Sequence, residues 1–136
     1  LGLDCFGAVD DVWTDAKEQL YVIDYKATSK NISDPNRLVY PEYKRQLGFY
    51  RWLLQQEGFT VATTGYLLYC NGLRNQPGFE GRMDFEVYLL PVAADNTWVI
   101  PTLHQLHTTL QQDAIPAAGD CDYCAYFEER HSTSLP

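Results

Sequence analysis

Leu20-Tyr-Val-Ile-Asp-Tyr-Lys26 is the stretch that decides the fold, because an apolar, β-branched run ends there in a carboxylate and an ammonium two residues apart. Side chains two apart on a strand share a face, so we expect Asp24 and Lys26 on one face and Ile23 and Tyr25 on the other. An acidic-x-Lys triplet occurs by chance about once in a chain of this composition. The neighbouring segments therefore have to give the triplet its meaning.

The segment before this run predicts a partner strand. Residues 3–13 are strand-like but interrupted at Gly7, where we expect a bulge or a close backbone approach. The polar residues 14–19 then form the turn of a β-hairpin. In an antiparallel pair, the residue numbers of directly opposed residues add to a constant. If Asp10 opposes Asp24, the turn is centred on Lys17. The two aspartates would then lie side by side, with Cβ atoms about 4.5–5.5 Å apart.

The segment after the run predicts a loop over residues 27–39 and then a helix. Pro41 suits the first turn of a helix, and Gly58 follows the last periodic residue as a stop signal. Gln46 lies at the edge of the apolar stripe, so we expect it to face inward or toward a cleft. The stripe itself consists of Tyr43, Leu47, Tyr50 and Leu54.

The second half of the chain predicts two more strands and a second helix. We expect strands at 60–70 and 84–90, a turn at Asn71-Gly72, a loop at 73–82 and a helix at 97–112. The order β-β-α-β-β-α predicts an α/β (α+β) fold with a mixed central β-sheet flanked by helices. A length of 136 residues fits a single domain over 1–136, with 116–136 as a C-terminal tail that carries a Cys-x2-Cys pair.

Composition excludes several classes of protein. A hydrophobic content of 46% with 14% aromatic residues is typical of a packed globular domain and not of a disordered chain. No apolar run is long enough for a membrane helix, and no basic-then-apolar leader precedes Leu1. We therefore expect a cytoplasmic protein without a membrane partner. Because the sequence does not begin with Met, we also expect it to be a fragment of a longer chain.

The net charge of −8 argues against indiscriminate binding to nucleic acid, which depends on neutralising phosphates. The charge is unevenly distributed, however, because residues 26–51 contain six basic residues and only two acids, Asp34 and Glu42. This segment predicts either a phosphate-binding face or a solvated helix flank, and charge alone does not favour one over the other. The six basic residues are Lys26, Lys30, Arg37, Lys44, Arg45 and Arg51.

Three short motifs together resemble the PD-(D/E)xK nuclease superfamily, and most closely its RecB-type nuclease domains and CRISPR-associated exonucleases. They are Gly7-Ala-Val-Asp10, Ile23-Asp24-Tyr25-Lys26 and Tyr43-x2-Gln46-x3-Tyr50. The resemblance covers about residues 5–70 and implies a restriction-endonuclease-like core. That family usually carries a Glu or His on a helix ahead of the first acidic strand. Asp10 lies too near Leu1 for such a helix, so we expect it to be missing here.

The chemistry of phosphodiester hydrolysis fits these residues. Metal ions held by carboxylates, with a cation beside them, are the main tools for this reaction. Magnesium prefers oxygen ligands and keeps several waters, so Asp10 and Asp24 could hold Mg²⁺ or Mn²⁺. The resemblance implies the Tyr25 backbone carbonyl as a third ligand. Lys26 would orient or help deprotonate the attacking water.

The remaining candidates surround this set. We expect Gln46 to fix Lys26 or to contact the nucleic acid, and Tyr50 to pack beside Gln46 or to touch a phosphate. Lys30, Lys44 and Arg45 are further candidates for binding nucleic acid.

These residues predict a Mg²⁺- or Mn²⁺-dependent deoxyribonuclease. The resemblance implies an exonuclease of DNA repair, recombination or defence, with DNA as substrate and a helicase or other repair protein as partner. The alternative is a catalytically incomplete nuclease-like module that binds nucleic acid or a protein. A separate alternative for Asp24 and Lys26 is an exposed ion pair that contributes little to stability.

The four cysteines allow several interpretations. The chain is larger than most disulfide-dependent scaffolds, so free thiols or metal ligands are favoured over bridges. Cys121 and Cys124 have the spacing of metal ligands, and His131 follows. The iron–sulfur members of the resembled group hold a cluster with C-terminal cysteines, and a zinc site is a further alternative. Plain thiols remain the favoured interpretation over either metal.

Overall fold

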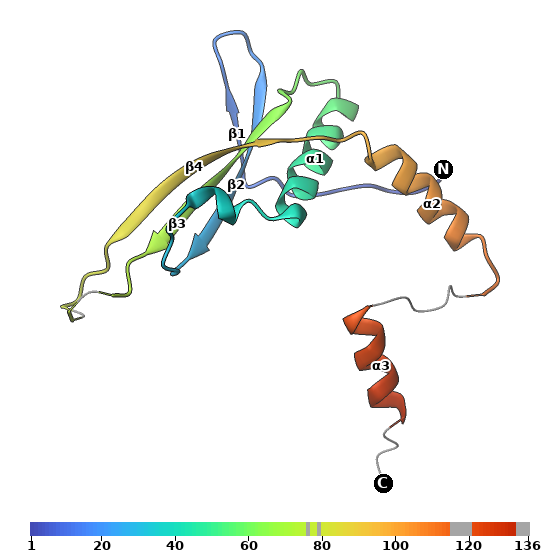
Figure 1. Ribbon diagram of the computed structural model, residues 1–136. Helices are drawn as coiled ribbons and strands as arrows, with labels where there is room; N and C mark the ends of the chain where they lie inside the picture. Colours follow the sequence, from blue (N-terminus) through green and yellow to red (C-terminus); the bar gives the residue numbers. More distant parts are fainter. Residues whose placement is uncertain (76, 79, 115–120, 133–136) are drawn as a thin grey trace.

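A four-stranded mixed sheet forms the centre of the fold, in the order β1-β2-β3-β4 (Figure 1). The computed structural model describes residues 1–75, 77–78, 80–114 and 121–132. Strands β1 and β2 are antiparallel, β2 and β3 are parallel, and β3 and β4 are antiparallel. The strands are β1 (Asp11–Thr14), β2 (Leu20–Thr28), β3 (Thr64–Gly72) and β4 (Phe85–Ala93). The expected mixed sheet flanked by helices is therefore confirmed.

The helices follow from the connections. A parallel pair needs a long crossover, and the chain between β2 and β3 supplies it with the 3₁₀ helix η1 (Pro35–Leu38) and α1 (Pro41–Gln56). Helix α1 begins at Pro41 as expected, and it ends before Gly58, which has a left-handed backbone with φ of 88°. Helices α2 (Val99–Leu110) and α3 (Asp122–Ser132) follow β4.

The core lies between α1 and one face of the sheet. Alternation along the strands puts Val22 of β2, Leu67 of β3 and Leu90 of β4 on this face, where they pack around Leu47 of α1. Asp24 has the same parity as Val22, so it also points toward α1. The strand thus carries a carboxylate into the most buried layer of the molecule, and Asp24 is only 1% exposed.

The opposite face of the sheet is rich in apolar side chains. Trp13 of β1 and Tyr66 of β3 contact one another there, with ring centroids 6.4 Å apart, and Tyr21 lies 6.1 Å from Tyr66. Val87 and Leu89 of β4 are exposed on this face. Ile23 is buried on this face too, but among the described residues the side of α1 is the more completely covered one.

The strand predicted over residues 3–13 is largely wrong, because only Asp11–Thr14 pairs with β2. The preceding residues run beside α1 instead of along the sheet. A Cβ atom at Gly7 would lie 2.8 Å from Cε1 of Tyr50, so this glycine permits the close backbone approach that the sequence predicts. The approach is to a helix, however, and not within a strand.

The predicted turn at Asn71-Gly72 is also wrong, because β3 continues through both residues. The Asn71 side chain makes backbone-like hydrogen bonds with Lys30, which satisfies an amide that would otherwise favour a turn. Strand β4 likewise runs past Pro91, which its place at the edge of the sheet permits. Strand β3 begins four residues later than predicted, at Thr64.

The predicted C-terminal tail contains a helix that the sequence pattern did not reveal. Helix α3 occupies Asp122–Ser132, and its described residues are exposed apart from a partly buried Cys124. An exposed helix has no need of an apolar stripe, so its periodicity is weak. Residues 116–120 and 133–136 of that tail lie outside the described residues. No helix in the described ranges is long and apolar enough to cross a membrane.

Candidate active site

The β1–β2 hairpin brings Asp10 and Asp24 together. Asp11 pairs with Ile23 and Thr14 with Leu20, which is the expected register and puts Asp10 beside Asp24 at the entry to β1. The Asp10 carboxylate accepts a hydrogen bond from the backbone N–H of Tyr25, with 2.8 Å between Oδ2 and N. This bond fixes the exposed Asp10 side chain against β2, one residue from the buried carboxylate.

Asp24 has an environment unlike that of an ordinary surface carboxylate. Burial raises the pKa of its carboxyl group, the nearby Lys26 ammonium opposes that shift, and the Asp10 carboxylate adds to it. A raised pKa with a charged partner and a second carboxylate beside it is typical of functional sites, although structural ion pairs also produce it.

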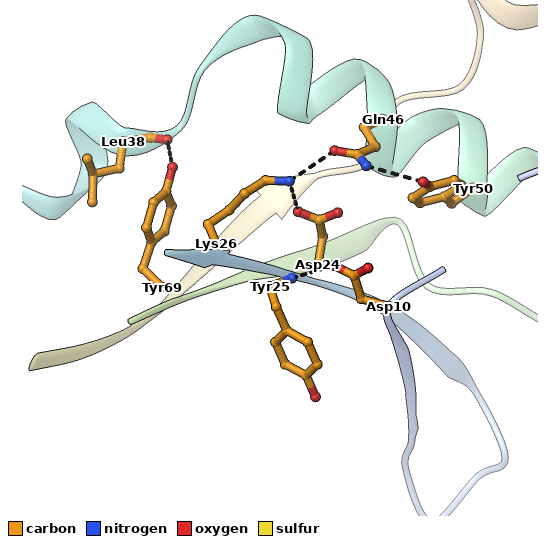
Figure 2. A network of polar contacts seen from close by, with 8 residues as sticks. All are labelled: Asp10, Asp24, Tyr25, Lys26, Leu38, Gln46, Tyr50 and Tyr69. Carbon is orange, nitrogen blue, oxygen red and sulfur yellow. Dashed lines mark hydrogen bonds and ion pairs between the residues drawn. The ribbon is translucent and has the colours of Figure 1, made fainter. Parts of the chain in front are cut away.

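Lys26 lies at the centre of a polar network (Figure 2). Its Nζ atom forms an ion pair with Oδ2 of Asp24 and donates a hydrogen bond of 3.2 Å to Oε1 of Gln46. Gln46 in turn donates from Nε2 to the hydroxyl oxygen of Tyr50, at 3.2 Å. Both amide atoms are thereby fixed, because the oxygen faces the cation and the nitrogen faces a hydroxyl. The structure therefore brings together Asp24, Lys26, Gln46 and Tyr50.

Tyr43 is a member of this site that the sequence did not reveal as functional. The Lys26 ammonium lies 4.5 Å from the centroid of the Tyr43 ring, within the range of a cation–π interaction. The sequence placed Tyr43 in the apolar stripe of the helix. Its position three residues before Gln46 is a signal that could have found it, because residues three apart on a helix are neighbours.

The donor set fits a hard divalent cation. Oδ2 of Asp24 is buried and contacts the Lys26 ammonium, and the Asp24 carboxylate lies beside that of Asp10. Asp10 supplies further carboxylate oxygen beside it. The described residues contain no group of three His, Cys, Asp or Glu side chains arranged for a metal. Two carboxylates suit Mg²⁺, which keeps several waters, better than they suit Zn²⁺.

Three predicted nucleic-acid contacts lie outside the network. Lys30 lies just beyond the end of β2, with Nζ 3.4 Å from the Tyr40 hydroxyl oxygen and 5.6 Å from the centroid of that ring. Lys44 and Arg45 are exposed on α1. At about 100° per residue, Lys44 lies roughly 200° around the helix from Gln46 and thus points away from the carboxylate pair.

The C-terminal cysteines lie on α3. All four cysteines of the chain are free thiols, and backbone N–H groups of Cys124 and Tyr123, together with the Cys124 thiol, lower the pKa of Cys121. His131 packs on Phe127, with ring centroids 4.2 Å apart. The structure does not bring Cys121, Cys124 and His131 into a ligand set among the described residues.

A hollow of the described surface lies away from the carboxylate pair. It measures about 470 Å³ and lies along the loop between β3 and β4, lined by Pro77, Gly78, Glu80, Arg82 and Asp84. A magnesium site needs converging oxygen atoms more than volume, so this mismatch does not count against the pair.

A sequence comparison shows the family that this chain resembles. A family model for the PD-(D/E)XK nuclease superfamily matches residues 5–128, which include both carboxylates, Lys26 and the whole of α1. Searches of curated proteins and of solved structures found no significant match.

Proposed function

Because the chain belongs to the PD-(D/E)XK nuclease superfamily, we propose that it is a Mg²⁺- or Mn²⁺-dependent nuclease that hydrolyses DNA at the Asp10–Asp24 carboxylate pair. The convergence of two carboxylates and an ammonium on the face of β2 that α1 covers is the observation that carries this proposal. Phosphodiester hydrolysis needs negative ligands for a metal and positive charge where the transition state becomes more anionic.

Each residue has a role that follows from its contacts. Asp10 and Asp24 would hold the divalent cation, and the resemblance to the family, rather than a contact, adds the Tyr25 carbonyl as a further ligand. When bound, the cation acts as a Lewis acid and lowers the pKa of water. Lys26 would then orient the attacking water and offset the charge that develops on the phosphate.

Gln46 acts through Lys26. Its amide oxygen accepts from Nζ, and Tyr50 fixes the amide from the other side. A long Lys side chain has many rotamers, so these contacts reduce the conformational freedom that must be lost on reaching the reactive geometry. Tyr43 restricts the same ammonium from its ring face.

The test is hydrolysis of labelled DNA with Mg²⁺ or Mn²⁺ by the wild type and by Lys26→Ala. We expect kcat to fall about 10²- to 10⁴-fold in the variant, the range for a positioned proton-transfer or charge-stabilising group. Lys17→Ala, in the exposed turn between β1 and β2, is the matched control and should retain wild-type activity. Full activity of Lys26→Ala would refute the assignment.

We further propose that the enzyme is an exonuclease of DNA repair, recombination or defence that works beside a helicase or another repair protein. The support is the likeness of its motifs to those of RecB-type nuclease domains. Linear and covalently closed circular DNA of one sequence distinguish the modes of cleavage, since an exonuclease degrades only the linear form. Nicking or linearisation of the circle at a similar rate would contradict this proposal.

A second candidate function is that of a nuclease-like module that binds nucleic acid or a protein without cleaving it. The supporting observation is that the described residues offer two carboxylates but no third His, Cys, Asp or Glu beside them. Titration with Mn²⁺, followed by electron paramagnetic resonance, separates the two candidates. Binding that Asp24→Asn abolishes supports the enzyme, whereas no binding by the wild type supports the module.

A further inference from the structure

Two hollows beyond the carboxyl end of β2 share Lys30 and Asn31 as common walls. One hollow, of about 170 Å³, extends along the loop before α1 to Arg37, and the other, of about 110 Å³, extends to Arg74 after β3. Lys30, Arg37 and Arg74 therefore line one continuous stretch of surface, which we name the cation patch. The β2–α1 loop and the β3–β4 loop meet at this patch.

The patch is built on buried anchors, so it is more than a chance arrangement of mobile side chains. Asn71, which is 2% exposed, accepts the Lys30 N–H at 3.0 Å and donates to the Lys30 carbonyl at 3.2 Å. The buried hydroxyl of Tyr69 donates to the Leu38 carbonyl at 2.8 Å, which holds η1 against β3. A further bond of 2.7 Å joins Asn75 to Asn31.

The three cations of the patch have charge available for a ligand. None of them forms an ion pair within the described ranges, and the Lys30 ammonium contacts the Tyr40 hydroxyl and ring. The acid that lines one hollow, Asp34, accepts hydrogen bonds from the Asn36 backbone and side chain and caps η1. Three positive charges on anchored backbone, with one capped acid beside them, attract an anion.

A pair of tyrosines connects the patch with the candidate active site. The Lys30 ammonium lies 5.6 Å from the Tyr40 centroid, Tyr40 and Tyr43 meet edge to face at 5.4 Å, and the Lys26 ammonium lies 4.5 Å from Tyr43. These three distances limit the separation of Lys26 from Lys30. One strand of B-form DNA advances by at most about four or five nucleotides along the helix axis over this upper limit.

We propose that the cation patch binds the phosphodiester backbone of the DNA strand a few nucleotides from the bond that is cleaved. This inference rests on the proposed nuclease function and extends it to a substrate-binding subsite. Phosphate contacts of this kind fix the register of the strand without reading its sequence. They would also explain how a chain of net charge −8 binds a polyanion, because the binding charge is concentrated next to the site.

The test measures DNA affinity in EDTA, where hydrolysis does not interfere, by fluorescence anisotropy across a range of salt concentrations. Arg37→Gln, Arg74→Gln and Lys30→Gln should each weaken binding about two- to fivefold, as expected for exposed charge pairs. Each should also lower the slope of log K against log salt by about 0.7 to 0.9. Lys17→Gln removes the same charge at the other end of β2 and should change neither quantity.

A small phosphodiester, bis(p-nitrophenyl) phosphate, separates this inference from the proposed function, because it is too short to reach the patch. The patch variants should hydrolyse it at the wild-type rate while degrading long DNA more slowly at limiting substrate. Unchanged affinity and salt slopes in all three variants would overturn the patch and leave the nuclease assignment intact. Failure of the wild type to hydrolyse either substrate would instead overturn the nuclease assignment, and the anisotropy data would still decide whether the patch binds DNA.

Discussion

Asp24 is a buried carboxylate whose position is unfavourable for folding and, in the proposed nuclease, useful for metal binding. Transfer of a charged group from water is costly unless the group is paired, and Lys26 supplies only part of that compensation. The remaining cost is a reason to assign the residue a function, because a purely structural position on this face of β2 would be served by an apolar side chain such as Val22 or Leu67.

Asp24→Asn should alter the pH dependence of stability in metal-free buffer. The folded state raises the pKa of Asp24 above its ordinary value of 3.8, so between these two pKa values the folded protein binds more protons than the unfolded chain. Wild-type stability therefore decreases as pH rises through this window, whereas the variant lacks this contribution. The difference in free energy of unfolding, Asp24→Asn minus wild type, should therefore become more positive as pH rises above about 4. Urea denaturation in EDTA measures it.

Asp15 provides the control with the opposite sign. Backbone N–H groups of Gln19 and Lys17 lower its pKa, so it contributes stability that is lost as pH falls below its ordinary pKa. Asp15→Asn should become less stable relative to wild type as pH rises. Parallel pH profiles for the wild type and Asp24→Asn would contradict the argument.

Tyr69→Phe should destabilise the protein by about 1 kcal/mol at neutral pH, because it removes the buried hydrogen bond to the Leu38 carbonyl. Burial, followed by the neighbouring Tyr43 and Tyr40, raises the pKa of Tyr69 well above its ordinary value of 10.0. As pH rises above 10, the Tyr69 hydroxyl loses its proton in the unfolded chain before it does so in the folded protein. The wild type should therefore lose stability that the variant does not. Urea denaturation at pH 7 and pH 11 measures both effects, with Tyr66→Phe as control.

Strand β2 contributes both to the stability of the sheet and to the candidate site. Its first residues pair with β1 and set the distance between the two aspartates, while its later residues pair with β3 and place Lys26 under α1. Helix α1 then contributes both the apolar Leu47 and the polar Gln46 from adjacent positions. A shift of one residue in the β1–β2 register would move Asp10 to the other face and separate the carboxylates.

Gly48→Ala should destabilise the protein, although Ala is the better helix former by about 1 kcal/mol. A Cβ atom at this position of α1 would lie 2.0 Å from the carbonyl oxygen of Asp95, so the helix and the segment before α2 would have to separate. We expect a net loss of roughly 1–3 kcal/mol, as for overpacking, in urea denaturation. Gly78→Ala, where nothing lies within 4 Å, should be close to neutral. Stabilisation by Gly48→Ala would show that this contact is absent.

The whole molecule consists of a sheet with one thickly covered face and a C-terminal helix that lies apart from it (Figure 1). The described residues of α3 are exposed or, at Cys124, partly buried. Charge is also distributed unevenly along the chain, because the net charge of −8 coexists with a basic segment between residues 26 and 51. Neither property is evident from the average composition.

Removal of residues 115–136 should leave the stability of the sheet domain nearly unchanged. Helix α3 buries little apolar surface, so its loss removes few favourable contacts. We expect the thermal midpoint of residues 1–114 to lie within about 2 °C of that of the full chain, by scanning calorimetry. A large decrease would show that the segment stabilises the sheet.

Sequence pattern predicted most of the fold and the central part of the candidate site. The start of α1 at Pro41 and its end before Gly58 were predictable because the signals are local. The strand predicted over residues 3–13 forms only at Asp11–Thr14, because Gly7 packs on Tyr50 of α1 and local propensity does not report such a contact. Asn71 was misassigned for the same reason, since its preference for a turn is satisfied by a distant segment, at Lys30.

The sequence by itself determined which residues are candidates for the proposed chemistry. The spacing of Asp24 and Lys26 puts them on one face of a strand, and the length of the turn allows Asp10 to lie beside them. Only the tertiary structure decided that Gln46 binds Lys26, that Tyr43 contacts the same ammonium and that three cations from two loops share one surface. The physical reason is the separation along the chain over which each kind of interaction acts. Periodicity and turn chemistry act over a few residues, whereas these contacts join segments that only the packing of α1 and β3 on β2 brings within reach.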